Sequence, residues 1–166
     1  MPSSTYKTLT LTDDKNKKYA DACLTVAKER SEYFEGEGIP NMAKDLQKHA
    51  LYVAVNSAEV MGFATIDKKS EFVAEISWMA VKPKHERQGI GSALVDHITN
   101  DLKPQGFRVL EVKTLASYDK DKAAFERTYA KTKRFYEKTG FMLVETIDPY
   151  PAWEPDNPCA IYVKVL

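Results

Sequence analysis

The sequence has few cysteines, no surplus of charge and no long apolar segment. Its two cysteines, Cys23 and Cys159, belong to neither a CxxC pair nor a metal-spaced cluster, so we expect free thiols and no metal site. No run of about 18 apolar residues occurs, which argues against a membrane-spanning helix. The N-terminus lacks the apolar stretch of a signal peptide, and free thiols suit a reducing compartment. The expected location is therefore cytoplasmic.

The charge balance gives no general reason to bind a large polyanion. Twenty-four Lys and Arg side chains balance twenty-four Asp and Glu side chains. A nucleic acid or an anionic membrane is therefore not an expected partner. Basic residues do cluster locally, within residues 82–87 and 131–134. Such short clusters suit a small polyanion better than a nucleic-acid backbone.

The length and the hydropathy pattern predict one globular domain covering residues 1–166. Period-two alternation and apolar runs predict strands, and apolar residues at helical spacing predict helices. The class is α/β (α+β), with a mixed, mostly antiparallel sheet of about seven strands and about four helices on both of its sides. Strands are expected at 6–12, 51–55, 60–66, 72–81, 107–115, 141–147 and 160–166. A long helix capped by Asp13-Asp14 should reach Tyr33-Phe34 and end at Gly36, Gly38 and Pro40, and further helices are expected at 41–49, 89–102 and 123–139.

The most informative segment runs from Ile76 to Leu94 and reads as a strand, a turn with two glycines and a helix. A helix start has backbone N–H groups without intrahelical partners and the positive end of the helix dipole. Glycine lets an anion approach such a backbone closely, so the turn can bind a diphosphate. Lys84 and Arg87 could add positive charge.

Two other phosphate-binding motifs do not fit this segment. A dinucleotide-binding Rossmann turn requires a third glycine where this chain has Leu94, and the Walker pattern GxxxxGK[ST] is absent. The turn alone leaves open a tight strand-to-helix connection that binds no ligand.

Two signatures resemble the Gcn5-related N-acetyltransferase (GNAT) superfamily. Glu75–Val81 followed by Arg87–Leu94 is similar to the acetyl-CoA-binding motif of that family, and Arg134–Phe141 is similar to its second, tyrosine-bearing signature. The resemblance covers roughly residues 5–166. It implies an enzyme that transfers the acetyl group of acetyl-CoA directly to an amine, without a metal, and it leaves a homodimer open.

The resemblance also implies which residues bind the cofactor. The turn and helix start should hold the pyrophosphate, and the backbone of the preceding strand should pair with the pantetheine arm. The implied cofactor-binding residues are Met79, Ala80, Val81, Arg87, Gln88, Gly89, Ile90, Gly91, Ser92, Tyr129 and Thr132. The chain departs from the family pattern at Glu86, where Gln or Arg is usual. Lys84 and Arg87 are expected to compensate for that negative charge.

Acetyl transfer requires a neutral amine, and a free alkylamine has a pKa of about 10.4. Glu75 lies in an otherwise apolar strand, where some GNAT enzymes place a general base, and apolar neighbours would raise its pKa. Tyr136 matches the family tyrosine that protonates the departing thiolate. The alternatives are an outward-facing strand glutamate and a core aromatic.

The acceptor amine should bind across the sheet from the cofactor. The candidate lining residues are Tyr33, Phe34, Trp78, Tyr150 and Trp153, and Glu32, Glu35, Glu37 and Asp148 could attract a cationic amine. His49, His85 and His97 look isolated, with His85 expected in solvent and His97 expected to be structural. A small-molecule amine and a peptide or protein amine remain open as acceptors. The alternative functions are a transferase for another acyl-CoA and a non-catalytic acyl-CoA-binding module.

Overall fold

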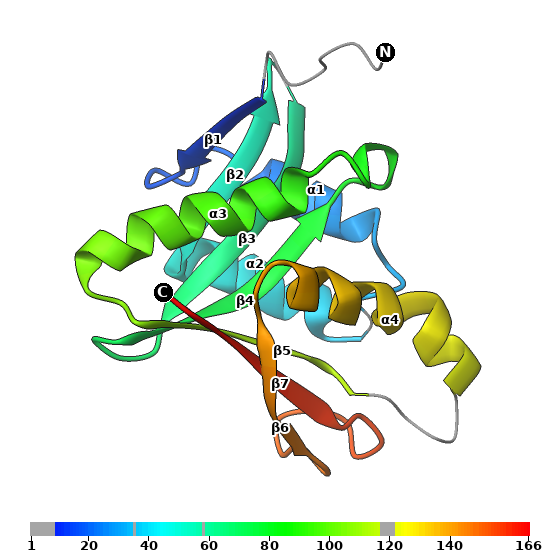
Figure 1. Cartoon of the computed structure of the whole chain (residues 1–166). Helices are drawn as coiled ribbons and strands as arrows, with labels where there is room; N and C mark the ends of the chain where they lie inside the picture. The colour runs from blue at the N-terminus through cyan, green and yellow to red at the C-terminus, as the bar shows by residue number, and fades with distance from the viewer. Residues whose placement is uncertain (1–8, 35, 58, 117–121) are drawn as a thin grey trace, which may run out of the picture.

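A computed structural model describes residues 9–34, 36–57, 59–116 and 122–166. Within these ranges the chain forms one seven-stranded sheet of order β1-β2-β3-β4-β5-β7-β6 and four α-helices (Figure 1). All neighbouring strands are antiparallel except β4 and β5. The predicted mixed, mostly antiparallel fold is confirmed. The elements are β1 (Leu9–Asp13), α1 (Ala20–Lys28), α2 (Gly38–Lys48), β2 (Ala50–Asn56), β3 (Glu59–Lys68), β4 (Val73–Val81), α3 (Ile90–Leu102), β5 (Val109–Leu115), α4 (Lys122–Lys138), β6 (Met142–Ile147) and β7 (Cys159–Val165).

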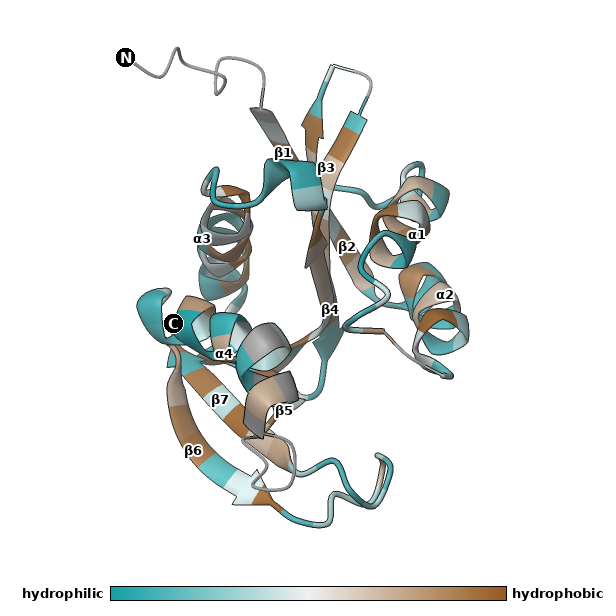
Figure 2. Ribbon diagram, turned by 90° about the vertical axis from the view of Figure 1, so that its right-hand side faces the viewer, coloured by the Kyte–Doolittle hydropathy of each residue, from teal (hydrophilic) through white to brown (hydrophobic). Residues whose placement is uncertain are grey.

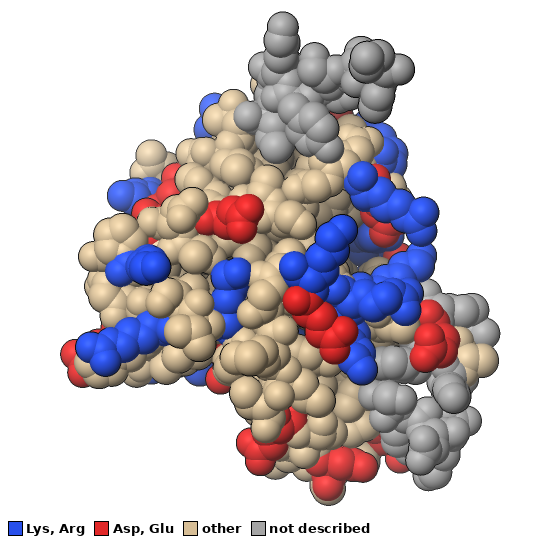
Figure 3. Space-filling view, viewed as in Figure 1, with Lys and Arg blue, Asp and Glu red and all other residues tan. Residues whose placement is uncertain are grey.

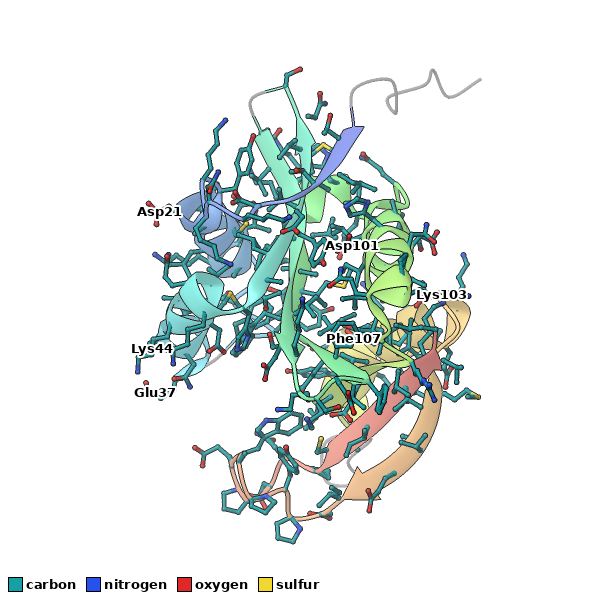
Figure 4. All side chains as sticks on the ribbon, turned by 90° about the vertical axis from the view of Figure 1, so that its left-hand side faces the viewer. Asp21, Glu37, Lys44, Asp101, Lys103 and Phe107 are labelled. Carbon is teal, nitrogen blue, oxygen red and sulfur yellow. The ribbon has the colours of Figure 1, made fainter. Side chains whose placement is uncertain are left out.

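The helices cover both faces of the sheet, as predicted. Figure 2 shows α3 and α4 on one side and α1 and α2 on the other. Leu94 and Ile98 of α3 are fully buried in one core, and Met42 and Leu46 of α2 are buried in the second. Burying one such side chain contributes about 2 kcal/mol, so the two cores fix the helices to the sheet. In Figure 4 the polar side chains of Asp101 and Lys103 on α3 and its end lie across the sheet from Glu37 and Lys44.

The parallel strands β4 and β5 separate after a short contact. They pair only from Val73–Ile76 to Val109–Val112, after which β4 continues along β3 and β5 continues along β7. At the point of separation, Thr65 pairs with Trp78 and Ile66 pairs with Ile76, so Ser77 is an extra residue. This β-bulge bends the strand and turns Ser77 and Trp78 toward the same face of the sheet.

The region before β2 differs from the prediction. The first helix ends at Lys28, followed by successive tight turns, and the second begins at Gly38 instead of Asn41. Pro40 therefore lies in the first turn of a helix, where its missing N–H has no intrahelical role. The carboxylate of Asp14 accepts the backbone N–H groups of Lys18 and Tyr19 in the turn before α1, but the helix begins only at Ala20 and has no side-chain cap, so the expected aspartate cap was wrong.

Both cysteines are buried free thiols, as expected. Burial raises the pKa of Cys23 to about 12 and that of Cys159 to about 11, so neither is a reactive thiolate at neutral pH. In the described part of the chain, no helix combines the length and the apolar character needed to cross a membrane.

Candidate active site

A groove of about 1850 Å³ lies where β4 and β5 separate. Its walls come from the α1–α2 connection, β4, the start of α3, β5, α4 and the loop before β7. Of the residues predicted as catalytic, cofactor-binding or acceptor-lining, all except Gln88 are among the described residues that line the groove. These are Tyr33, Phe34, Glu75, Trp78, Met79, Ala80, Val81, Arg87, Gly89, Ile90, Gly91, Ser92, Tyr129, Thr132, Tyr136, Tyr150 and Trp153.

The start of α3 offers backbone donors to this groove. No side chain caps the helix, and the first intrahelical bond joins the N–H of Ala93 to the carbonyl of Gly89 at 2.9 Å. The N–H groups of Ile90, Gly91 and Ser92 precede that bond and have no intrahelical acceptor. Gly89 has φ +77°, a left-handed conformation that favours glycine. This end of a thirteen-residue helix can therefore bind an anion through its backbone.

Among the described residues, no strand pairs with the groove-facing edge of β4 beyond Ile76. The backbone N–H of Lys82 donates to the carbonyl of Met61 at 2.9 Å, so this N–H group points toward β3. Because residues of an antiparallel ladder alternate in direction, the N–H groups of Met79 and Val81 point away from β3, toward the groove. Two of the predicted cofactor-binding positions, Met79 and Val81, therefore present backbone donors to the groove.

Only some residues of the two basic clusters in the sequence line the groove. Arg87, Lys131 and Arg134 line the groove, and Figure 3 shows Lys and Arg side chains gathered where α3 begins and α4 passes. Lys84 instead lies 2.7 Å from the carboxylate of Glu59. Hydrogen bonds from Lys82 and Lys84 lower the pKa of Glu59 to about 2. Lys84 is thus already paired.

The compensation expected for Glu86 from Lys84 and Arg87 comes mainly from another residue, with Arg87 a smaller contributor and Lys84 paired with Glu59 instead. The carboxylate of Glu86 is paired with the guanidinium of Arg30, and this hydrogen bond lowers the pKa of Glu86. Arg30 also lies 3.1 Å from Glu32 and 5.4 Å from the ring centre of Tyr33. Glu86 is therefore neutralised from the α1–α2 connection and ties that connection to the turn before α3.

The α1–α2 connection also reaches α4. The hydroxyl of Tyr33 donates to the carbonyl of Thr128 at 3.0 Å, and the Tyr129 hydroxyl donates to the carbonyl of Tyr33 at 3.4 Å. Their rings meet edge to face at 5.6 Å, and burial raises the pKa of Tyr33. Phe34 packs on Trp78 with ring centres 5.9 Å apart. These contacts join the connection to α4 through Tyr33 and to β4 through Phe34.

Glu75 has ionic rather than apolar partners, contrary to the expectation. Its carboxylate lies 2.8 Å from Nζ of Lys113 and 3.4 Å from Nζ of Lys69, and its side chain is 13% exposed. Burial opposes the charge of Lys113, but the hydrogen bonds that Lys113 donates to Glu111 and Glu75 outweigh burial and raise the pKa of that lysine. Glu75 therefore faces the groove as an oriented, ion-paired carboxylate.

Tyr136 is both a core residue and part of the groove wall. Its side chain is only 6% exposed, and its ring lies 5.1 Å from Phe135 and 5.2 Å from Phe141. Burial raises the pKa of Tyr136, so the phenol keeps its proton at neutral pH. The core position and the donor role that the sequence posed as alternatives are physically compatible.

Sequence reasoning missed a polar network on the α2 side of the groove, because its members are far apart in the chain. Nδ1 of His49 lies 2.8 Å from the Ser77 hydroxyl, so His49 is not isolated. Nε2 of His49 lies 3.8 Å from Asp45 and 3.9 Å from Asp67. Asp45 also accepts the indole N–H of Trp78 at 2.8 Å. No local pattern marks these residues as a group.

Of the other two histidines, His85 lies in a different environment from the expected one and His97 lies in the expected one. His85 is only 18% exposed, beside Glu59 at 3.5 Å, so its expected solvent environment was wrong. His97 packs edge to face on Tyr52 at 5.9 Å, which agrees with a structural role.

The expected acceptor side is only partly assembled by the residues predicted for it. Trp153 packs on Tyr150 at 5.1 Å, and both line the groove. Glu32 and Glu37 line it as well, Asp148 is not among the described lining residues, and Glu35 lies outside the described residues.

A family model described as an acetyltransferase (GNAT) domain matches residues 47–143, which is more than half of the chain. The match includes β4, the start of α3 and Tyr136. No curated protein is significantly similar to the chain in sequence.

Several solved structures share the fold at low sequence identity. A protein described as a GNAT-family acetyltransferase from Desulfovibrio desulfuricans has a TM-score of 0.80 at 20% identity, covering 95% of this chain and 98% of that one. A GNAT acetyltransferase from Elizabethkingia anophelis with acetyl-CoA bound has a TM-score of 0.69 at 20% identity, covering 96% and 99%. The ribosomal-protein-S18-alanine N-acetyltransferase from Escherichia coli has a TM-score of 0.70 at 19% identity, covering 95% and 93%.

Proposed function

The chain belongs to the GNAT family of acetyltransferases, and from this premise we propose that it transfers the acetyl group of acetyl-CoA directly to a primary amine. The observation that carries the proposal is the groove, because it joins an uncapped helix start, an unpaired strand edge and a buried phenol. Acetyl-CoA supplies an electrophilic thioester carbon and a thiolate leaving group when it is bound.

The binding roles follow from the geometry. The N–H groups at the start of α3 suit the pyrophosphate, with Arg87, Lys131 and Arg134 adding positive charge. The N–H groups of Met79 and Val81 suit the pantetheine arm and the thioester oxygen. Tyr129 and Thr132 border the same groove from α4.

The proposed proton transfers use two groups. Glu75 is the proposed base, because it is an ionised carboxylate at the groove, and Tyr136 is the proposed acid, because it keeps its proton at neutral pH. A base and an acid on opposite walls would let the amine lose a proton while the thiolate gains one.

The ammonium of Lys69 indicates the kind of acceptor. It lies in the groove, 3.3 Å from Asp67 and 3.4 Å from Glu75, and the charge of Glu75 raises its pKa. The side chain is about half exposed, so an incoming ammonium group can replace it. We therefore propose a cationic primary amine as acceptor, with Tyr33, Phe34, Trp78 and Trp153 lining its site. The Escherichia coli relative is described as a ribosomal-protein-S18-alanine N-acetyltransferase, which supports including a protein amine among the acceptors.

The test is release of CoA from acetyl-CoA over a panel of amines: an alkyl diamine, an amino sugar, an amino acid amide and a peptide with a free N-terminus. The proposal predicts that at least one becomes acetylated. Binding of acetyl-CoA without transfer to any amine would favour the acyl-CoA-binding module. Transfer from a longer acyl-CoA alone would favour the other transferase.

We also propose that the chain is a single domain that forms a homodimer. β6 is an edge strand whose Met142, Leu143 and Val144 are each about half exposed. Such an edge presents unpaired backbone groups and apolar side chains, which a second copy of β6 would cover. Sedimentation velocity is expected to show the mass of a pair.

A further inference from the structure

Ser77 and His49 form a hydrogen-bonded pair that the roles proposed above leave unused. The Ser77 hydroxyl lies 2.8 Å from Nδ1 of His49 and 2.8 Å from the hydroxyl of Thr65. Ser77 and His49 both line the groove, whereas Thr65 is fully buried beneath them. The pair therefore connects the groove with a fixed, polar interior.

The surroundings of His49 give this chain of hydrogen bonds a direction. Asp45 and Asp67 lie on the Nε2 side of the ring, at 3.8 Å and 3.9 Å. Their negative charge favours the tautomer with its proton on Nε2, which leaves Nδ1 to accept the Ser77 proton. The Thr65 hydroxyl can then donate to Ser77, so proton acceptance runs from the groove toward the imidazole.

The proposed reaction needs a second proton acceptor. A primary ammonium loses two protons on becoming an amide: one before nitrogen attacks and one after the carbon–nitrogen bond has formed. Glu75 takes the first in the function proposed above. When the carbon–sulfur bond breaks, the thiolate takes a proton from Tyr136, and the second nitrogen proton still has to leave.

We propose that Ser77 and His49 accept this second proton. Ser77 takes it from the amine nitrogen while passing its own hydroxyl proton to Nδ1 of His49. Glu75 and His49 then hold two protons and Tyr136 has given one. Return of one proton to Tyr136 leaves the single proton that the overall reaction releases to solvent.

The position of the bulge supports this assignment. The bulge turns Ser77 toward the acceptor side where β4 and β5 separate, two residues beyond Glu75 and two before the free N–H of Met79. The nitrogen of an amine that attacks a thioester carbonyl held near Met79 therefore lies next to the Ser77 hydroxyl. Ser77 contacts the amine, and His49 acts through Ser77 as a positioning residue. The inference rests on the proposed N-acetyltransferase function.

The test uses the full chain, acetyl-CoA and the best acceptor of the amine panel. His49→Ala is expected to lower kcat about 10²-fold and to leave the acetyl-CoA dissociation constant unchanged. Added imidazole is expected to restore part of that rate, since a free base can replace the missing ring. Ser77→Ala should lower kcat as much as His49→Ala does, and imidazole should not restore it. Ser77→Thr should keep the wild-type kcat. His97→Ala, a histidine outside the groove, is the matched control.

A His49→Ala enzyme with the wild-type kcat would overturn the inference, as would a loss of rate that imidazole does not restore. If His49→Ala does not fold, the comparison of Ser77→Ala with Ser77→Thr decides, because equal rates in both would remove the hydroxyl from the reaction. A wild-type enzyme that acetylates no amine would reject the proposed function itself.

Discussion

At the residue scale, Glu75 and Tyr136 occupy opposite electrostatic settings in one groove. Two ammonium groups lie within 3.4 Å of the Glu75 carboxylate, whereas rings surround the Tyr136 phenol. The ammonium groups orient the carboxylate by ion pairing, and burial among the rings favours a neutral phenol. The two settings thus separate a proton acceptor from a proton donor at the same pH.

Replacing Tyr136 by Phe tests the donor. Tyr136→Phe removes one hydroxyl and keeps the ring packing, so kcat should fall about 10²-fold while acetyl-CoA affinity holds. Steady-state kinetics and calorimetric binding measure the two quantities. Tyr162→Phe, another buried phenol that does not line the groove, should change neither. Normal turnover by Tyr136→Phe would refute the acid role.

Replacing Glu75 by Gln tests the acceptor. Glu75→Gln should lower the rate about 10²-fold at neutral pH. The rate should partly recover at high pH, because the fraction of free amine rises toward its pKa of about 10.4. The pH profile of kcat measures this. Glu111→Gln, the other carboxylate beside Lys113, is the control, and an unchanged profile in Glu75→Gln would remove it from the mechanism.

At the element scale, the start of α3 depends on a left-handed glycine. Gly89→Ala should weaken acetyl-CoA binding about tenfold, because left-handed backbone costs an L-residue about 1–2 kcal/mol and the donors would shift. Isothermal titration measures this affinity. Gly106→Ala is the matched control, since Gly106 also has positive φ, at +95°, and open space around it. It should lose similar stability but bind acetyl-CoA normally; equal weakening in both would contradict the site.

The ion pair between Arg30 and Glu86 joins two elements across the groove. Arg30→Ala would remove the main partner of the Glu86 charge beside the proposed pyrophosphate site, leaving only the weaker influence of Lys131 and Arg87, so acetyl-CoA affinity should fall. The loss should grow at low salt, where repulsion is less screened. The double variant Arg30→Ala/Glu86→Gln should recover most of the affinity in salt-dependent titrations. No recovery would show that Arg30 acts through something other than Glu86.

Local sequence determined most elements, but not the contacts between them. The glycines of the turn and the apolar spacing of α3 act within a few residues, so the helix was predictable. Arg30 and Glu86 are 56 residues apart, and His49 and Ser77 are 28 apart, so only the folded sheet brings them together. Pro40 was expected to end the first helix but lies in the first turn of the second. A proline signals a helix boundary without indicating whether a helix ends or begins there.

At the scale of the whole molecule, the separation of β4 from β5 organises the site. One sheet supplies a strand edge and an opening, Arg87 and α4 supply positive charge on one side, and the α2 side supplies carboxylates together with Lys44 and Lys48. In the proposed function, the cofactor pyrophosphate and the acceptor amine bind on opposite sides of this opening.

The most direct test of this account is mass spectrometry of an amine panel incubated with the enzyme and acetyl-CoA, alongside a CoA-thiol assay. We predict that a cationic primary amine gains one acetyl group for every CoA released. Acetyl-CoA that binds but stays intact in the presence of every amine would contradict the account.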